Sequence, residues 1–397
     1  MLHQRFSEEE IHGEKGEVSM RVALVGDYPV DPNVFIGGPQ AILSYLLGAL
    51  GQITDLELHV VTANKAVDNS YTSQRNGVTF HYLPFPTVTL LAFSSVQRSI
   101  HRVLHHIKPD LVHGQDAFIL GCIALSAGYP TVLTPHSVHS TDIRFGSRWI
   151  DRLNVRLQHM VARRYFVSRV RHIVSVSPYI RSNYEPYVDA TFHDINYPVA
   201  DRFFGLDPDY EIPNQVLFVG LLKARKRPDL ALEALALARQ KVPELNLQFA
   251  GAAEEPGLEA KLRDLIVKND LGGNVKFLGQ LTEAKLLEAY QQMSILVLTS
   301  ELETSPMAVE QAMAAGKPVV ATAAGGVPFL VDHGRTGLVV ELNKAEQIAQ
   351  ALVTLARDPE LRRRIGQAAR DDALSRSASD IVARKTYDMY RVILECS

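Results

Sequence analysis

The sequence has 397 residues, of which 46% are hydrophobic and 21% charged, and a formal net charge of −3. This length favours two domains of ordinary size, and the composition excludes collagen-like, low-complexity and disordered chains. No apolar run reaches the eighteen residues of a membrane-spanning helix, and the first twenty residues lack the apolar core of a secretory signal. Two cysteines, Cys122 and Cys396, form neither a metal-ligand cluster nor a disulfide framework, so we expect a cytoplasmic protein.

Residues 1–19 carry two basic and five acidic side chains, and we interpret them as a disordered or vector-derived tail. After them, short β-branched runs alternate with helical patterns, which predicts parallel sheets covered by helices. Strands are expected in the first half at 21–26, 56–62, 78–83, 110–113, 131–134 and 172–177, and in the second at 215–220, 245–251, 275–279, 295–300, 318–322 and 337–340. Helices are expected at 39–50, 94–107, 229–241, 257–269, 283–293, 306–315 and 344–356.

The strand count restarts after about residue 198, and the Pro/Asp-rich stretch 196–214 is the expected linker. The predicted fold class is therefore α/β, with two Rossmann-like, doubly wound domains over 20–198 and 199–379. A helix at about 380–395 is expected to pack back on the first domain. Two such domains facing each other place a ligand cleft at the carboxyl ends of their strands.

Two short segments indicate phosphate binding. Gly37-Gly38-Pro39-Gln40 opens a helix, where glycines permit close backbone approach and free amides attract phosphate. The same pattern also describes an ordinary turn with Pro39 at the first helical position, and the two interpretations carry equal weight. The loop 221–228 contains four cations at the end of a predicted strand. Most charge runs are solvated loops, but this position favours a phosphate site.

The segment 299–322 carries the densest signal. A strand ends near Ser300, a polar loop contains Glu303, Pro306 can start a helix, and Gly316 can end it. Glu303 in the loop and Gln311 in the helix can both face the cleft. From the residues alone, this is only a strand–helix–strand unit. A second close-approach turn, at 324–328, follows the next strand.

Taken together, these motifs resemble the GT-B glycosyltransferases, most closely the retaining enzymes of family 4, also called glycosyl transferases group 1. The resemblance covers about residues 20–395. In the second half it rests on VG-x5-K (219–226), NVKFLG (274–279), S-x2-E (300–303), AMAAGKPVVAT (312–322), GGVP (325–328) and GRTGLVV (334–340). In the first half it rests on IGG (36–38), PDLVH (109–113), TPHS (134–137), VSVS (174–177) and NYPV (196–199).

The resemblance implies transfer of a sugar from a nucleoside-diphosphate sugar to a hydroxyl, with retention and without a metal or other cofactor. The donor would be a UDP- or GDP-sugar, and the acceptor a glycan or a lipid-linked molecule of cell-surface polysaccharide or glycolipid biosynthesis. The catalytic residues would be His136 at the donor sugar, Lys226 at the leaving diphosphate and Glu303 at the sugar hydroxyls. The other donor-binding residues would be Gly37, Gly38, Arg225, Leu278, Thr304, Ser305, Pro306, Met307 and Gln311, with the base resting near Leu278.

Three positions depart from the family pattern. Leu221 replaces an arginine that follows the strand glycine, Gln311 replaces the second glutamate of E-x7-E, and Phe329 replaces the glutamate that ends GG-x-PE. Glutamine can still accept a hydrogen bond from a ribose hydroxyl. Arg225 or Arg227 is expected to take the place of the missing arginine. Glu310 lies one residue before the position of the second glutamate in E-x7-E, and its side chain would point about 100° away from that of Gln311 around the helix.

Isolated histidines are more often structural than catalytic, and His136 competes with His139 and with His101, His105, His106 and His113. Its place directly after a predicted strand favours His136 as the donor-sugar ligand.

Between residues 144 and 181 the chain has nine arginines and a single acid, Asp151. Arg144, Arg148, Arg152 and Arg156 recur every four residues, so a helix would align them on one face. A solvated helix face is the usual explanation of such a run. The alternatives are a phosphate-bearing acceptor or an anionic membrane surface, with peripheral attachment to the inner face of the membrane. Nucleic acid is not expected, because no binding motif accompanies the arginines.

Two other functional classes remain open. A non-catalytic nucleotide-sugar-binding subunit would explain Leu221, Gln311 and Phe329. Nucleotide-sugar epimerases and glycan phosphorylases share the architecture, but the sequence shows neither the paired carboxylates of the first nor the pyridoxal-phosphate lysine pattern of the second.

Overall fold

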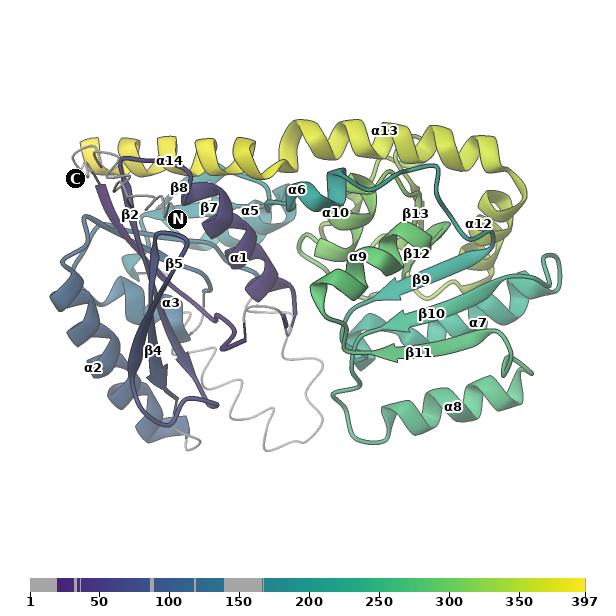
Figure 1. Cartoon of the computed structure of the whole chain (residues 1–397), viewed down its shortest axis with the longest axis horizontal. Helices are drawn as coiled ribbons and strands as arrows, with labels where there is room; N and C mark the ends of the chain where they lie inside the picture. Colours follow the sequence, from purple (N-terminus) through teal and green to yellow (C-terminus); the bar gives the residue numbers. More distant parts are fainter. Residues whose placement is uncertain are drawn as a thin grey trace, which may run out of the picture.

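The computed structural model describes residues 20–31, 34–35, 37–85, 89–117, 119–138, 166 and 168–396, with the backbone alone at 89–93. The chain forms two α/β domains side by side, each built on its own largely parallel sheet (Figure 1). The predicted fold class is confirmed. Within the described residues, no helix is both long and apolar enough to cross a membrane.

The N-terminal sheet has eight strands in the order β3-β4-β2-β1-β5-β6-β7-β8. Their bounds are Met20–Val25 (β1), Leu56–Asn64 (β2), Tyr71–Arg75 (β3), Val78–Pro84 (β4), Leu111–Gly114 (β5), Thr131–Leu133 (β6), His172–Ser175 (β7) and Thr191–Asp194 (β8). The central strands β1 and β5 are almost wholly buried, which agrees with their continuous apolar runs.

The expectation of purely parallel pairing was wrong at one edge of this sheet. Strand β3 pairs antiparallel with β4. The two are joined at Asn76-Gly77, both with positive φ, of 49° and 79°. Asn-Gly between two strands is a strong hairpin signal, but the sequence of β3 is too polar to stand out as a strand. Sequence analysis also missed β8, which has little buried surface.

Among the described residues, the helices of the first domain are Gly38–Leu50 (α1), Thr89–Ile107 (α2), Ile119–Leu125 (α3) and Pro178–Tyr184 (α5). Helix α2 begins five residues before the predicted start, and neither α3 nor α5 was predicted. At seven residues each, α3 and α5 are too short to show a clear helical period.

The C-terminal sheet is wholly parallel and has the strand order β11-β10-β9-β12-β13-β14. Its strands are Gln215–Val219 (β9), Asn246–Ala250 (β10), Val275–Gly279 (β11), Ile295–Leu298 (β12), Val319–Thr322 (β13) and Leu338–Val340 (β14). Its helices are Pro228–Arg239 (α7), Leu258–Lys268 (α8), Glu283–Gln292 (α9), Met307–Ala314 (α10), Val327–Leu330 (α11) and Ala345–Arg357 (α12). The predicted strands and helices of this domain agree with the structure to within about two residues, whereas the four-residue helix α11 was not predicted.

Two long helices, Pro359–Ser377 (α13) and Ser379–Glu395 (α14), run along one side of both domains (Figure 1). Sequence analysis did not predict α13. The helices meet at Ala378, where the amide of Val199 donates to the carbonyl of Ser377 at 2.8 Å. The chain therefore crosses between the domains at two adjacent points. Helix α14 returns to the first domain, and its Tyr390 hydroxyl lies 2.6 Å from Nδ1 of His113.

The linker is anchored to the second domain rather than loose. Lys317, from the AAGKPVV motif, is only 1% exposed, and its Nζ donates to the carbonyls of Pro208 at 3.1 Å and Tyr210 at 2.5 Å. Burial lowers the pKa of Lys317, while neighbouring acids led by Glu211 act in the opposite direction. This motif lysine therefore fixes the linker.

Candidate functional site

A cavity of about 530 Å³ lies between the two domains and is lined by both. Its walls are built from residues that follow β1, β5 and β6 in the first domain and β9 and β12 in the second. These are the carboxyl ends of parallel strands, where loops converge in doubly wound folds.

Most of the sequence-predicted site residues come together in this cavity. They are Gly37, Gly38, His136, Arg225, Lys226, Glu303, Thr304, Ser305, Pro306, Met307 and Gln311. Leu278 is not among the lining residues and instead packs against the hydrophobic core. The chain turns at Gly279, where φ is +66°, and Gln280 and Leu281 line the cavity in its place. Gln280 also donates from Nε2 to the carbonyl of Phe35 at 2.7 Å, across the two domains.

Glu303 is the buried acid of the cavity, 6% exposed. Its Oε1 lies 2.8 Å from Nζ of Lys226 and accepts from the Ser300 hydroxyl at 2.7 Å, and its Oε2 lies 3.7 Å from Nη1 of Arg225. Burial acts to raise the pKa of Glu303, but the charges of Lys226 and Arg225 outweigh it, and the net shift is downward. The carboxylate therefore stays ionised, with its lone pairs held in fixed directions.

The lysine reaches this acid because of the glycine at the end of β9. Gly220 has φ +140°, and a Cβ there would lie 3.3 Å from Cε of Lys226. In the next strand, a Cβ at Gly251 would lie 2.1 Å from the carbonyl oxygen of Gly220. A side chain at either glycine would therefore crowd the lysine or the backbone that positions it.

Arg225 and Arg227 were both expected to replace the family arginine in whose place this chain has Leu221, and the structure distinguishes between them. Leu221 and Arg225 both line the cavity. Arg225 donates to the carbonyl of Leu302 at 2.5 Å. Arg227 does not line the cavity and pairs with Asp229 at 2.9 Å and Glu301 at 3.0 Å. Of the two, only Arg225 is placed to contact an anion in the cavity.

The amino ends of two helices meet at the cavity. Helix α1 begins beside Gly37, which has φ +97°, and a Cβ at Gly38 would lie 3.6 Å from Cγ of Met307, the first residue of α10. The first amides of any helix lack an intrahelical acceptor and carry partial positive charge. Their convergence with Arg225 and Lys226 gives this part of the cavity a concentration of positive charge.

Glu310 and Gln311 face different sides of α10, about 100° apart. Gln311 lines the cavity, accepts from the Tyr290 hydroxyl at 3.0 Å and donates to the Tyr45 hydroxyl at 3.2 Å. Glu310 is fully buried against α13, where it accepts from Arg376 at 3.2 Å and Ser377 at 3.1 Å. Glu310 is therefore structural, and position 311 is the one that faces the cleft.

His136 is half-buried in the first-domain wall of the cavity. Its Nδ1 lies 2.8 Å from the Tyr197 hydroxyl, and its Nε2 has no hydrogen-bond partner among the described residues. Burial lowers the pKa of His136 to about 4, so the ring is neutral at physiological pH. In the tautomer in which Tyr197 donates to Nδ1, the ring proton lies on Nε2, which is then a hydrogen-bond donor. The backbone carbonyl of His136 accepts from Thr304 at 3.0 Å, which joins the two walls.

The histidines that compete with His136 in the sequence do not line the cavity where they are described. His113 is fully buried between Tyr390 and Thr134, and His101 lies 2.8 Å from the Ser126 hydroxyl. His105 and His106 lie in the last turn of α2, away from the cavity. His139 lies outside the described residues.

The turn at 324–328 supports the Glu303 loop from behind. A Cβ at Gly325 would lie 2.2 Å from the carbonyl oxygen of Glu303, and a Cβ at Gly326 1.8 Å from that of Thr304. The Gly326 amide donates to the Glu303 carbonyl at 2.8 Å. Phe329, which follows the turn, is 60% exposed and does not line the cavity. Phe329 stands where the family pattern has a glutamate, and because it lies outside the cavity this replacement does not alter the cavity wall.

Several cavity residues were not singled out from the sequence. They are Asp27, Tyr45, Gln115, Asp116, Tyr197 and Gln280. Asp27, Gln115 and Asp116 follow the predicted strands 21–26 and 110–113 within three residues. Their position at strand ends was the available signal, but a single polar residue after a strand is common.

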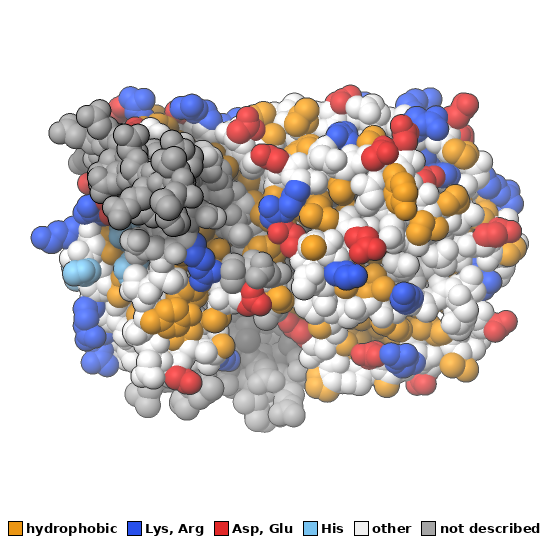
Figure 2. All heavy atoms as spheres, viewed as in Figure 1, with side chains coloured by type: hydrophobic (Ala, Val, Ile, Leu, Met, Phe, Trp, Pro, Cys, Tyr) orange, Lys and Arg blue, Asp and Glu red, His pale blue; other side chains and the backbone are white. Residues whose placement is uncertain are grey.

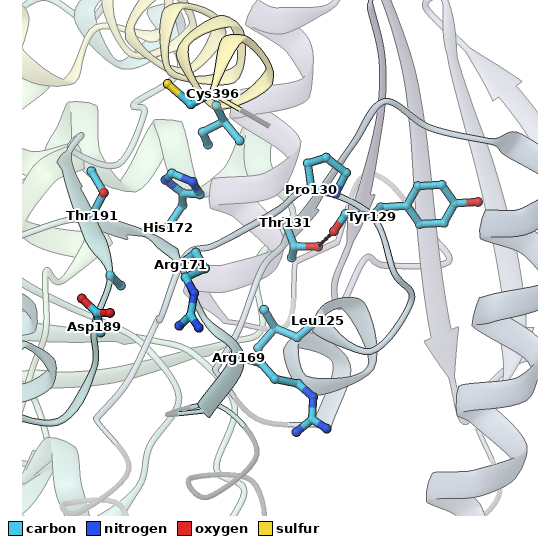
Figure 3. A pocket seen from close by; sticks show the side chains of 12 residues that line it. Leu125, Tyr129, Pro130, Thr131, Arg169, Arg171, His172, Asp189, Thr191 and Cys396 are labelled. Carbon is cyan, nitrogen blue, oxygen red and sulfur yellow. Dashed lines mark hydrogen bonds between the residues drawn. The ribbon is translucent and has the colours of Figure 1, made fainter.

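A second cavity, of about 570 Å³, lies at the amino ends of β6, β7 and β8, the opposite edge of the N-terminal sheet (Figure 3). Arg169 and Arg171 of the arginine-rich segment line it. Arg181 instead pairs with Asp194 at 2.8 Å. In Figure 3, His172 points toward Cys396, whereas the guanidinium groups of Arg169 and Arg171 point away from it. The other six arginines, including all four of the predicted helix face, lie outside the described residues.

Comparison with known proteins agrees with this geometry. Residues 37–189 match the glycosyl transferase 4-like domain, and residues 207–372 match the glycosyl transferases group 1. The fold, the two matches and the interdomain cavity together define a GT-B glycosyltransferase, and the chain belongs to the group 1 family.

Individual relatives are distant. An uncharacterised glycosyltransferase of Methanocaldococcus jannaschii is 25% identical over 347 residues, which cover 84% of this chain and 88% of that protein. The D-inositol 3-phosphate glycosyltransferase of Pseudarthrobacter chlorophenolicus is 34% identical over 186 residues, 46% of this chain and 44% of that protein. The structure of Anabaena HepE in complex with UDP-glucose superposes with a TM-score of 0.74 at 18% identity, covering 94% of this chain and all of that chain.

Proposed function

We propose that the protein transfers a sugar from a nucleoside-diphosphate sugar to a hydroxyl of a glycan or lipid-linked acceptor, with retention at the anomeric carbon and without a metal ion. The observation that carries the proposal is the Glu303–Lys226 pair, set where the amino ends of α1 and α10 converge. The group 1 family match and a structural neighbour solved with UDP-glucose support a UDP-sugar donor first and a GDP-sugar second.

In this proposal the diphosphate lies between the helix amino ends, beside Lys226 and Arg225. As the bond between the anomeric carbon and the diphosphate breaks, negative charge grows on the leaving oxygen, and the two cations stabilise it. The acceptor oxygen bonds to the anomeric carbon, and its proton passes to the departing diphosphate oxygen. Glu303 accepts hydrogen bonds from donor-sugar hydroxyls, and His136 donates to the same sugar from Nε2. Gln311 binds the ribose, and the nucleotide base lies near Gln280 and Leu281.

The competing proposal is a subunit that binds nucleotide sugars without turnover. It rests on Leu221, Gln311 and Phe329. The structure weakens two of these three grounds, because Phe329 is outside the cavity and Gln311 occupies the cleft-facing position. Catalysis is therefore the proposal that we favour.

The two proposals differ in one measurement. The purified chain is incubated with UDP- and GDP-sugars, and release of nucleoside diphosphate is followed with and without EDTA. Slow release with one donor, unaffected by EDTA, supports the catalytic proposal. Binding of a donor without release, also in the presence of sugar and glycolipid acceptors, would support the binding subunit. Activity that disappears in EDTA and returns with Mn²⁺ or Mg²⁺ would overturn metal independence.

We further infer a cytoplasmic location with reversible attachment to an anionic membrane face. The support is the excess of arginine between residues 144 and 181. Arg169 and Arg171 lie at the sheet edge opposite the cleft, so they are poorly placed to bring an acceptor to it. The proposed attachment therefore depends on the arginines between 144 and 164.

A further inference from the structure

The wall of the interdomain cavity formed by the first domain has its own chemistry. Its polar lining includes Asp27 after β1, Gln115 and Asp116 after β5, and His136 after β6. Every lysine and arginine among the described lining residues, namely Lys223, Arg225 and Lys226, belongs to the second domain. The lining cations therefore all lie on the second-domain wall, which also carries the carboxylate of Glu303, whereas the charged acidic and basic residues that line the first-domain wall, Asp27 and Asp116, are both carboxylates.

The carboxylates of this wall are held in place. Asp27 accepts from Nε2 of Gln40 at 2.9 Å, and Gln40 is itself a buried residue of α1. Asp116 accepts from the amide of Gly121 at 2.8 Å, and a Cβ at Gly121 would lie 2.1 Å from the Asp116 carbonyl oxygen. Each carboxylate is thus an acceptor with a fixed direction before any ligand arrives.

A buried donor accompanies them. Gln115 is 4% exposed, and its Nε2 has no hydrogen-bond partner among the described residues. A buried amide donor without a partner is unfavourable, and a ligand acceptor would remove that penalty. A Cβ at Gly26 would lie 2.6 Å from Cβ of Gln115, so the glycine makes room for this side chain. Nε2 of His136 is a second unpartnered group on the same wall.

Alternating acceptors and donors match a hydroxylated ligand. A hydroxyl donates to a carboxylate and accepts from an amide or a ring N–H, so neighbouring hydroxyls can satisfy both kinds of group. A phosphate can only accept at neutral pH, and two carboxylates would repel it. Each such repulsion is stronger in a partly buried cavity than in water.

Building on the proposed function, we propose that the acceptor presents an uncharged polyhydroxyl group, a sugar or cyclitol ring, to Asp27, Gln115 and Asp116. The phosphate or lipid that such an acceptor carries lies outside this part of the cleft. The D-inositol 3-phosphate glycosyltransferase of Pseudarthrobacter chlorophenolicus is similar to less than half of this chain, so its named acceptor does not identify the acceptor of this protein.

The test uses the full chain and a nucleotide sugar that it hydrolyses slowly. Release of nucleoside diphosphate is measured alone, then with glucose or myo-inositol, and then with glucose 6-phosphate or inositol 3-phosphate. We expect the neutral compounds to raise the rate at least fivefold and their phosphates to raise it less at equal concentration. A larger stimulation by the phosphates would overturn the inference and leave the proposed function standing. Absence of release under every condition would instead contradict the proposed function.

Two variants locate the effect. Asp27→Asn should raise KM for the neutral acceptor about tenfold, because a charged hydrogen bond becomes a neutral one. Asp27→Lys should reduce the ratio of the rate with the neutral acceptor to the rate with its phosphate. The reason is that the substitution replaces a negative charge at the proposed acceptor site by a positive one. Asp68→Asn is the matched control, an exposed aspartate outside the cavity, and should leave the acceptor KM unchanged. An unchanged KM and preference in both Asp27 variants, with thermal unfolding as for the wild type, would place the acceptor elsewhere.

Discussion

The two walls of the cleft hold their polar groups in different ways. The second-domain wall concentrates charge: Lys226 and Arg225 surround the ionised Glu303. The first-domain wall holds the half-buried His136 and the buried Tyr197 as neutral groups, and desolvation raises the pKa of Tyr197 and lowers that of His136. A charged wall suits a diphosphate whose charge grows during the reaction, whereas a neutral and acidic wall suits hydroxyls.

The part of the second-domain surface seen in Figure 2 does not share the charge pattern of the cleft wall. On the face seen in Figure 2, acidic and basic side chains are interspersed over the second domain. The polarity of the cleft is therefore a local property of the strand ends and does not follow from the charge of either domain. Changes to each wall should accordingly have separable effects on donor and acceptor chemistry.

The largest effect is expected at the charged wall. Glu303→Ala should lower kcat about 10²–10³-fold, because the donor sugar loses an ionised acceptor near the reacting carbon. Steady-state kinetics with a saturating donor measures this. Glu301→Ala is the control, since Glu301 pairs with Arg227 and does not line the cavity. Wild-type turnover in Glu303→Ala would show that the loop has been assigned wrongly.

A comparable but smaller loss is expected at the partner of that acid. Lys226→Ala should lower kcat about 10²-fold, because charge on the leaving diphosphate loses its nearest cation. Lys223→Ala should cost less, since Lys223 is 37% exposed and pairs with Glu254 at 2.6 Å. The comparison of the two lysines in one assay distinguishes a specific contact from the general positive charge of the loop. Equal losses in both would favour the general charge.

Two histidines of the first domain, His113 in the core and His136 in the cavity wall, predict a pH dependence of stability. Burial lowers the pKa of His113 to about 3 and that of His136 to about 4, below the usual 6.5. The unfolded chain therefore binds more protons than the folded one below pH 6.5, and stability should fall as the pH drops from 6.5 toward 4. Between pH 7.5 and pH 5 each histidine would contribute a loss of about 2 kcal/mol.

Urea unfolding at the two pH values measures this loss. His113→Asn should reduce the difference between them by about 2 kcal/mol, whatever it does to stability at pH 7.5. The pKa of Glu303 is lowered, so its stabilising effect is lost only below about pH 4.5, outside this window. An unchanged difference in His113→Asn would mean that the folded protein accepts a proton at this site.

A modest effect is expected where the two walls touch. Gln311→Ala should weaken donor-nucleotide binding by about 1 kcal/mol, about fivefold in affinity, because one neutral hydrogen bond is lost. Gln311→Glu should be tolerated, since a carboxylate can accept from Tyr290 and from a ribose hydroxyl. Titration calorimetry with the nucleoside diphosphate measures both. A loss of kcat without loss of affinity in Gln311→Ala would contradict a ribose contact.

The smallest effect concerns the membrane. Each arginine near an anionic surface would contribute about 1 kcal/mol, weakened by salt. Sedimentation with anionic and neutral liposomes should show binding to the anionic ones alone, lost at high salt and in the triple change of Arg148, Arg152 and Arg156 to Glu. Replacing Arg181, which is already paired with Asp194, is the control and should have little effect. Equal binding to both liposomes would leave the arginines as a solvated helix face.

The sequence by itself determined the alternation of strands and helices, the restart of the sheet after residue 198 and the donor-side motifs. These are local properties, because apolar runs, capping residues and glycine turns act over a few residues. Glu303, Pro306 and Gln311 lie within nine residues of one another, so their convergence follows from one loop and one helix. Lys226 could be assigned to the same site from the sequence, because the carboxyl ends of parallel strands meet at one edge of a sheet.

Only the tertiary structure decided which long-range partners these residues meet. Lys317, a cation within a family motif, fixes the linker 107 residues away in sequence rather than the donor. Glu310 and Gln311 are adjacent, yet packing of α13 on α10 buries one and leaves the other facing the cleft. The first-domain wall brings together Asp27, which follows β1, and Gln115 and Asp116, which follow β5. These residues meet because β1 and β5 are neighbours in the sheet. Sheet order is set by burial of whole faces, which no short pattern of residues encodes.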